Sequence, residues 1–431
     1  MTLASLSLEQ APPISVPFRF FLSAPLFLLL AATALMLAGP AALESRWSPA
    51  LLSITHLLTL GCMSMVMCGA MLQLLPVLAG APVPNPRLVA WAIHLPLVAG
   101  TLLLCGGLYF ATTTLLELAM PFLAFAFAVF LIIAIYSLAR APARNASTHA
   151  MMLALAALSL TVGLGLLLAA GITGLLDMPM LPLVALHASW GLLGWTALLV
   201  IGVAYQVVPM FQLTPLYPRT VTRWLGSILF ALLLLWSYHL LLPQPAANVL
   251  SLIASSGMAA CIAAFTVITL RLQHKRRRRV PDISLQFWRI GMLSLLTATL
   301  LWMIGQTSTT LADSTFYSLA LGILFIIGFA LSVIQGMLYK IVPFLVWFHL
   351  QSKLPSKQVP NMKNIIPDRA VRWHLHAHLA SLLLCLASAI WPMPWIYPAG
   401  GALLLCGLLL LANLYSAWNC YLRMAEKTSA M

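Results

Sequence analysis

The segment from Thr55 to Val77, THLLTLGCMSMVMCGAMLQLLPV, decides the fold class of the chain. It has no charged side chain and is long enough for one helix to cross a lipid bilayer. Its one histidine, His56, is costly to place inside a membrane, so it is a candidate functional residue. The segment also carries glycines and, near its end, the pattern Gln-x-x-Pro.

Two later segments repeat this pattern. Leu186 to Phe211, LHASWGLLGWTALLVIGVAYQVVPMF, again combines a histidine, glycines and Gln-x-x-Pro, and Gln335 to Phe344, QGMLYKIVPF, keeps the end of it. The three prolines are Pro76, Pro209 and Pro343, so the differences 209 − 76 and 343 − 209 are 133 and 134 residues. Equal spacing on this scale indicates that one unit is repeated three times.

Composition places the chain among membrane proteins. Of its 431 residues, 62% are hydrophobic and only 7% are charged, which excludes a soluble domain and predicts an all-α polytopic membrane protein. The formal net charge of +14 does not indicate nucleic-acid binding, because the basic residues fall in loops. The seven cysteines are an odd number without Cys-x-x-Cys spacing, so a disulfide framework is not expected.

We expect about 12 transmembrane helices, each close to the roughly 20 residues that a crossing requires. They are predicted near residues 17–40, 50–79, 88–111, 114–138, 149–173, 181–211, 222–242, 247–271, 286–310, 315–348, 373–392 and 395–421. We expect a single transmembrane domain over residues 1–431, built from four-helix repeats at approximately 17–140, 149–272 and 286–421. Three such repeats predict a pseudo-threefold ring with the second, sixth and tenth spans near its axis.

The basic residues predict the orientation. Of the 22 Lys and Arg residues, only Arg46 falls on the face that holds the loops after odd-numbered spans. The positive-inside rule therefore places both termini in the cytoplasm. The first residues lack a basic n-region, so we expect no cleaved signal. The run HKRRRR at 274–279 is predicted to be an orientation anchor; the alternative is a site for anionic lipid headgroups or a partner.

His56 and His187 are predicted to lie at a similar depth in the outer part of the membrane. Imidazole binds iron, copper and zinc, and histidine commonly holds haem iron. Helical spacing places Met63 and Met67 on the face of His56, and Gly191, Gly194, Gly202 and Tyr205 on the face of His187. A smooth glycine face suits a flat macrocycle, so these residues are the candidate cofactor-binding set. The alternatives are helix packing for the glycines and a carbonyl hydrogen bond for either histidine.

Other residues suggest metal binding less directly. His239 ends the seventh span on the outer side and is a third candidate metal ligand beside His56 and His187. The methionines and cysteines of the second span suggest a ladder for copper(I), although methionine is also ordinary apolar filler. His374 and His378 are one helical turn apart and can chelate a metal. Their position beside basic residues favours instead a solvated helix start at the cytoplasmic interface.

The sequence lacks residues and motifs that are typical of several function classes. No acidic residue lies deep in a predicted span, whereas proton-coupled transporters and pumps usually need one. The sequence contains no P-loop, Gly-x-Ser-x-Gly or His-Glu-x-x-His motif.

The layout resembles a known superfamily. Twelve spans in a threefold repeat, cytoplasmic termini and a histidine toward the outer face of the second span resemble subunit I of the haem-copper oxidases. The segments THLLTLGCMSMVMCGAMLQLLPVLAG and LHASWGLLGWTALLVIGVAYQVVPM look like the corresponding spans of NnrS-like proteins, a haem-copper-oxidase-like group associated with nitric oxide metabolism. The resemblance covers most of the chain in layout and the second and sixth spans in motif.

This resemblance implies roles for individual residues. His56 matches the second-span histidine that binds low-spin haem in the oxidases. His187 falls in the sixth span, where those enzymes place a copper ligand, but the surrounding His-Pro-Glu pattern is missing. The tenth span has no histidine before His349, and the seventh has Tyr238-His239 in place of a histidine pair. The resemblance therefore implies one haem site rather than a full haem-copper centre.

The leading hypothesis is a b-type haem protein of the bacterial inner (cytoplasmic) membrane, with a redox, sensing or tolerance role linked to nitric oxide or respiration. Whether it turns over a substrate is left open. Its expected partners are the lipid bilayer and subunits of respiratory or denitrification complexes. The alternatives are a copper-handling or solute transporter, or an assembly or accessory subunit without a cofactor.

Overall fold

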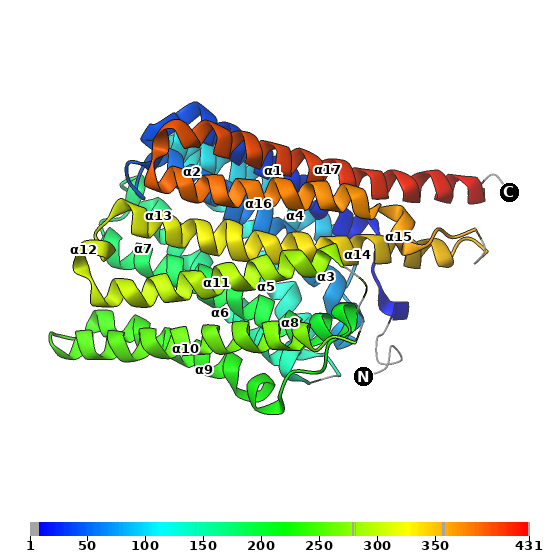
Figure 1. Cartoon of the computed structure of the whole chain (residues 1–431), viewed down its shortest axis with the longest axis horizontal. Helices are drawn as coiled ribbons and strands as arrows, with labels where there is room; N and C mark the ends of the chain where they lie inside the picture. The colour runs from blue at the N-terminus through cyan, green and yellow to red at the C-terminus, as the bar shows by residue number, and fades with distance from the viewer. Residues whose placement is uncertain (1–7, 143, 278–279, 281, 356–357, 430–431) are drawn as a thin grey trace.

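The structure is a computed structural model that describes residues 8–142, 144–277, 280, 282–355 and 358–429 (Figure 1). All regular secondary structure in these residues is helical, and 12 helical segments are long and apolar enough to cross a membrane. The predicted all-α polytopic fold is therefore confirmed. Two arginines of the basic run at 274–279, Arg278 and Arg279, lie outside the described residues.

The twelve crossing segments follow the predicted order. The first six contain α1 (Ser15–Ala38), α2 (Pro49–His56) with η4 (Leu57–Ser64) and α3 (Met65–Ala79), α4 (Pro86–Tyr109), α5 (Thr113–Ala139), α6 (Ala146–Ile172), and α7 (Met180–Ser189) with η5 (Trp190–Ala197) and α8 (Leu198–Gln212). The last six contain α9 (Arg219–Tyr238), α10 (Ala246–His274), α11 (Ile283–Thr307), α13 (Thr315–Ile323) with η7 (Leu324–Leu331) and α14 (Ser332–Gln351), α16 (Asp368–Ile390) and α17 (Pro392–Ser429). Short helices α12 (Thr309–Ala312) and α15 (Met362–Ile365) lie in connections.

The second, sixth and tenth spans form the centre of the bundle. Their most apolar windows are 67, 67 and 78% buried, whereas the other nine spans range from 22 to 50%. Around them, α5 packs on α6, α10 packs on α11, and α17 returns to α1, which closes a ring. This arrangement matches the predicted pseudo-threefold layout. The exact boundaries of the three repeats stay a prediction.

Each central span contains a π-helix of eight residues. These segments, η4, η5 and η7, begin at residues 57, 190 and 324, so they have the same spacing of 133 and 134 as the three prolines. A π-helix widens the backbone locally and is often found at functional sites. The central helices are thus interrupted at one equivalent level in all three spans.

A glycine stands fifth in each π-helix, and a second glycine follows eight residues later. The six are Gly61 and Gly69, Gly194 and Gly202, and Gly328 and Gly336. A Cβ atom on Gly194 would lie 2.7 Å from Ala157 of α6, and one on Gly328 would lie 2.6 Å from Ser294 of α11. Glycine is therefore required where the first helix of each unit crosses the central helix closely. The third copy thus keeps both glycines and the proline, although it has neither the histidine nor Gln-x-x-Pro.

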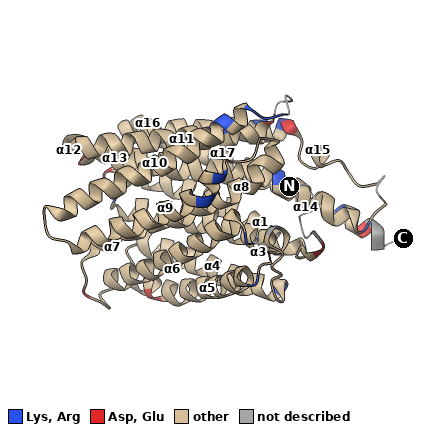
Figure 2. Ribbon diagram, turned by 90° about the horizontal axis from the view of Figure 1, so that it is seen from below, with Lys and Arg blue, Asp and Glu red and all other residues tan. Residues whose placement is uncertain are grey.

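The basic residues gather at one end of the bundle. Figure 2 shows most of the Lys and Arg positions along the ribbon near α15 and the ends of α8 and α14, away from the end that holds α7, α12 and α13. The beginning of α1 and the end of α17 lie at the same charged end (Figure 1). The assignment of that end to the cytoplasm stays a prediction.

Candidate functional site

His56 and His187 lie side by side. His56 is the last residue of α2, and His187 belongs to the last turn of α7. Their ring centroids are 6.2 Å apart and their planes differ by 24°. Two histidines 131 residues apart in sequence thus meet with nearly parallel rings.

Hydrogen bonds fix the tautomer of both rings. Nδ1 of His56 donates to the carbonyl of Leu52 at 2.8 Å, and Nδ1 of His187 donates to the carbonyl of Thr161 at 3.0 Å. A carbonyl can only accept, so the ring proton sits on Nδ1 and the Nε2 lone pair is free. Among the described residues no hydrogen bond reaches either Nε2. This is the tautomer that a metal-binding imidazole needs.

The two histidines are not at equivalent positions of the repeat. The spacing of the π-helices relates His56 to Ser189, two residues after His187. A shift of two residues turns a side chain by about 200° around a helix. The expected matched pair is therefore corrected: the rings meet because they leave their helices in different directions, not because the repeat duplicates them.

The glycines near His187 lie against α6. A Cβ on Gly191 would lie 3.2 Å from Thr161, and one on Gly202 would lie 2.7 Å from Ala150. With Gly194 against Ala157, this whole face packs on one neighbouring helix. The open groove expected below His187 is thus filled by α6, and the small residues serve close helix packing.

The remaining predicted cofactor residues are in the core. Met63 and Met67 are buried in the main hydrophobic cluster. The hydroxyl of Tyr205 donates to the carbonyl of Val221 at 3.4 Å, and its ring lies 5.3 Å from that of Tyr217. These contacts direct Tyr205 toward the beginning of α9. A role of Met63, Met67 and Tyr205 in cofactor binding stays a prediction, and no contact with either histidine supports it.

His239 is held apart from the pair. Its Nδ1 donates to the carbonyl of Trp236, and its ring packs on that of Trp236. In the described part of the chain it makes no contact with His56 or His187. Its role as a third metal ligand stays a prediction, and the pair stands as a two-imidazole site.

The histidine pair lies where the residues of the central helices are least buried. α7 has no buried residue, and in α2 only Ser53 and Ile54 are buried. By contrast, all eight residues of η7 are buried. His56 and His187 are both partly accessible although they face the interior. The outer ends of these helices are therefore less buried than the level of the π-helices below them.

His374 and His378 are placed differently from the prediction. Both are fully buried, at 0% exposure, between α14, α16 and α17. Nδ1 of His374 hydrogen-bonds the hydroxyl of Tyr339 at 2.9 Å, and Nε2 of His378 hydrogen-bonds that of Ser332 at 2.7 Å. The expected solvated helix start is wrong, because only the opposite face of α16, with Trp373 and His376, is exposed.

The sequence carried a signal for this burial. Small and polar residues recur along α16 at spacings of four and three, which is the period of one buried helix face. They are His374, His378, Ser381, Cys385 and Ser388, and all five are buried. The nearby arginines, Arg369 and Arg372, belong to the other, exposed face of the same helix.

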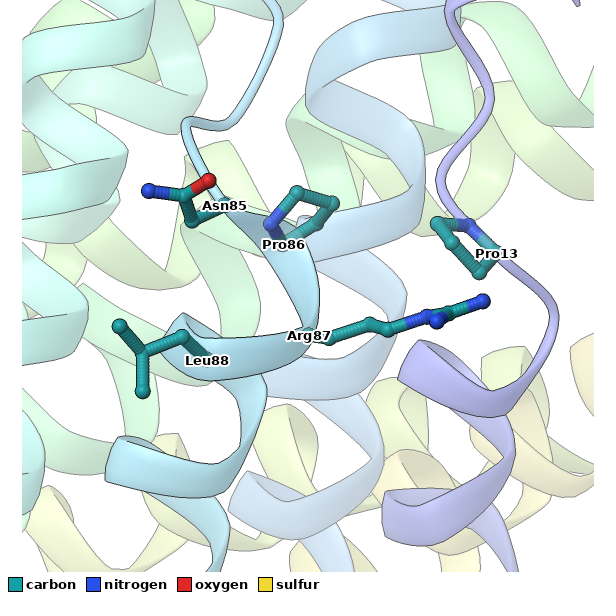
Figure 3. A pocket seen from close by; sticks show the side chains of 5 residues that line it. All are labelled: Pro13, Asn85, Pro86, Arg87 and Leu88. Atoms are coloured by element: carbon teal, nitrogen blue, oxygen red, sulfur yellow. The ribbon is translucent and has the colours of Figure 1, made fainter.

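One surface hollow is separate from both histidine groups. It lies between the segment before α1 and the beginning of α4, and Figure 3 shows Arg87 extending toward Pro13. Its other lining residues are Asn85, Pro86 and Leu88. It offers one guanidinium and no metal-binding or nucleophilic side chain.

Comparison with known proteins supports the fold. No protein-family model matches the chain, and no curated protein matches its sequence. A solved structure described as a haem-copper terminal oxidase dimer is similar to it, with a TM-score of 0.60 and 12% identity, over 96% of this chain and 84% of that one. The chain has an oxidase-like fold. At this identity the similarity concerns the fold alone, and the oxidase-like fold places His56 and His187 in its central helices.

Proposed function

We propose that the chain is a haem-binding membrane protein in which His56 and His187 would hold the iron. The observation that carries this proposal is the pair of nearly parallel rings, each with Nδ1 bound to a carbonyl and Nε2 free. A metal ion held between two imidazole rings sets the distance between their centroids. This distance is the sum of two metal–nitrogen bonds of about 2 Å and the two distances from nitrogen to ring centre, which is roughly 6 Å. The measured separation of 6.2 Å fits one metal ion between the rings.

The protein's part in this site is orientation and shielding. The carbonyls of Leu52 and Thr161 hold the two rings and increase the basicity of Nε2. The surrounding helices are apolar and exclude water from the level below the pair. The sequence has no Cys-x-x-Cys-His attachment motif, which favours noncovalent haem b. Such a haem supplies one-electron chemistry or the binding of small ligands.

A role in nitric oxide metabolism or respiration is part of the same proposal. The oxidase-like fold supports a respiratory setting. The resemblance of the second and sixth spans to NnrS-like proteins supports a redox, sensing or tolerance function linked to nitric oxide. We place the chain in a bacterial inner membrane with cytoplasmic termini, beside subunits of respiratory or denitrification complexes. Copper handling is a second candidate, because different residues support a copper site, as argued below.

Optical spectra of the purified protein test the haem proposal. After expression with ample haem, we expect a Soret band in the oxidised protein that shifts on reduction with dithionite. His56→Ala and His187→Ala should each remove or strongly alter this band. His149→Ala is the matched control, because His149 binds Ser227 on another part of the surface. A colourless wild-type protein, or a band unchanged in both variants, would overturn the proposal.

A further inference from the structure

A second cluster of metal-binding side chains lies among α14, α16 and α17. It contains His374, His378 and Cys406, each with 0% exposure. Sγ of Cys406 lies between the two rings, 3.2 Å from Nε2 of His374 and 3.9 Å from Nδ1 of His378. An ionisable cluster at this depth in a membrane protein calls for a functional explanation.

The two sulfur–nitrogen distances of the cluster are close to those around a bound metal ion. A thiolate sulfur binds at about 2.3 Å and an imidazole nitrogen at about 2.0–2.1 Å, so at angles of roughly 109–120° they lie about 3.5–3.8 Å apart. The two measured distances of 3.2 and 3.9 Å fall on either side of that range. As placed, the thiol hydrogen-bonds with the rings, and no group of three His, Cys, Asp or Glu side chains in the described residues has the geometry to hold a metal ion without a shift of its donor atoms. Binding requires Sγ to move by a few tenths of an ångström.

Each ring is held from behind by a hydroxyl. The second nitrogen of His374 binds Tyr339, which accepts a further bond from Nδ2 of Asn413 at 2.8 Å. The second nitrogen of His378 binds Ser332. Metal-binding histidines are typically oriented in this way by a partner on the other ring nitrogen. When each ring donates to its hydroxyl, with Tyr339 accepting from both His374 and Asn413, an unprotonated nitrogen of each ring faces Cys406.

Gln335 supplies a candidate for a weak fourth ligand. Its Nε2 lies 3.7 Å from Sγ of Cys406, and its Oε1 is buried without a hydrogen-bond partner. Rotation of the amide by half a turn would exchange these atoms and direct the oxygen to the cluster. Two histidines, one cysteine and a weak axial glutamine are a donor set that copper favours.

Charge distinguishes copper(I) from zinc at this depth. No carboxylate is among the described contacts of the cluster, so the Cys406 thiolate is its one available negative charge. Copper(I) and one thiolate give zero net charge, whereas zinc would leave one uncompensated positive charge in an apolar region. The neighbouring thiols of Cys62 and Cys385 also favour a soft cation.

We propose that His374, His378 and Cys406 form a buried copper(I) site, with Gln335 as a weak fourth ligand. On binding, the S–H bond of Cys406 breaks, the copper–sulfur bond forms, and one proton is released to water for each copper ion bound. The oxidation state of the metal does not change. This site is separate from His56 and His187 and does not depend on haem binding there.

Metal analysis of anaerobically purified protein tests the site. The wild type, incubated with excess copper(I) and then desalted, should retain one copper ion per chain. Cys406→Ser should lose it, because a hydroxyl is a poor ligand for copper(I). His376→Ala, on the exposed face of the same α16, and Cys420→Ser, further along α17, are the matched controls and should keep it. His56→Ala should also keep it, which separates this proposal from the haem site.

X-ray absorption of the wild type covers the case in which Cys406→Ser fails to fold. The expected ligand shell contains one sulfur and two nitrogens. A shell of nitrogen and oxygen alone would overturn the proposal. So would a wild type that retains no copper, a preference for zinc over copper(I), or an unchanged copper content in a folded Cys406→Ser protein.

Discussion

The two histidine pairs of this chain are held by different kinds of partner. The rings of His56 and His187 are fixed by backbone carbonyls and stay partly accessible. The rings of His374 and His378 are fixed by side-chain hydroxyls on one side and a thiol on the other, and they are fully buried. The first pair leaves a nitrogen free on each ring for a large group, whereas the second is closed around one atom. Two sites of the same residue type are therefore suited to different ligands.

The largest expected effect is the loss of haem when a histidine of the first pair, but not of the second, is replaced. His187→Ala should reduce haem content at least about tenfold, because removal of a ligand or its support costs that much in related metal sites. His374→Ala should leave the haem band in place, since its partners lie on α14 and α17. Haem and copper per chain, measured on the same samples, check both statements. Loss of haem in both variants would show that the two regions are not independent.

Tyr339→Phe should be the most destabilising change in the closed cluster. It leaves Nδ1 of His374 without its partner, and it leaves Nδ2 of Asn413 with only the carbonyl of Ala370 at 3.5 Å. Each unsatisfied buried group costs about 1–3 kcal/mol, so we expect a loss of about 3 kcal/mol. The midpoint of thermal unfolding in detergent measures it, with the exposed Ser318→Ala as the control. An unchanged midpoint would mean that water or another side chain replaces the hydroxyl.

Gly194→Val should disturb the open pair through the backbone. The added side chain would collide with Ala157 and push α6 away from η5. Overpacking of this kind costs about 2 kcal/mol. It should also move the Thr161 carbonyl from His187 and shift the haem spectrum. Gly322→Ala is the control, because nothing lies within 4 Å of a Cβ there. A spectrum that stays the same while stability falls would show that the ring does not depend on α6.

The sequence was sufficient for the fold because hydropathy and charge determine the spans of a membrane protein. The fifth span, for example, was expected at 149–173 and is found as Ala146–Ile172. The proximity of His56 and His187 was also predictable. Each belongs to a central helix, and both were expected at a similar depth, so the two side chains were expected to lie near each other. Whether they bind a metal is a matter of chemistry that spacing alone does not decide.

Two features depended on contacts between distant segments. The π-helices form where three central helices are crossed by close neighbours, and sequence reasoning missed them although Gly-x7-Gly-x6-Pro occurs three times. The burial of His374 was missed because basic residues nearby suggested water. On a helix, residues close in sequence point to different faces. Arg372 is therefore exposed although His374, two residues later, is buried. The period of four and three along α16 was the more reliable indicator.

The smallest expected effect concerns the support of a single ring. Ser332→Ala removes the hydroxyl behind His378 and leaves its Nε2 unpaired. In membrane proteins such a bond contributes about 1 kcal/mol, so the thermal midpoint should fall only slightly. Copper(I) affinity, measured against a chromophoric chelator, should fall about tenfold, since supporting partners are worth that much to metal binding. Ser381→Ala, on the same buried face but bonded only to the backbone of its own helix, should leave the affinity unchanged. If Ser332→Ala lowers stability but not copper affinity, the hydroxyl serves packing alone, and the contrast between a closed metal cluster and an open histidine pair loses its basis in ring orientation.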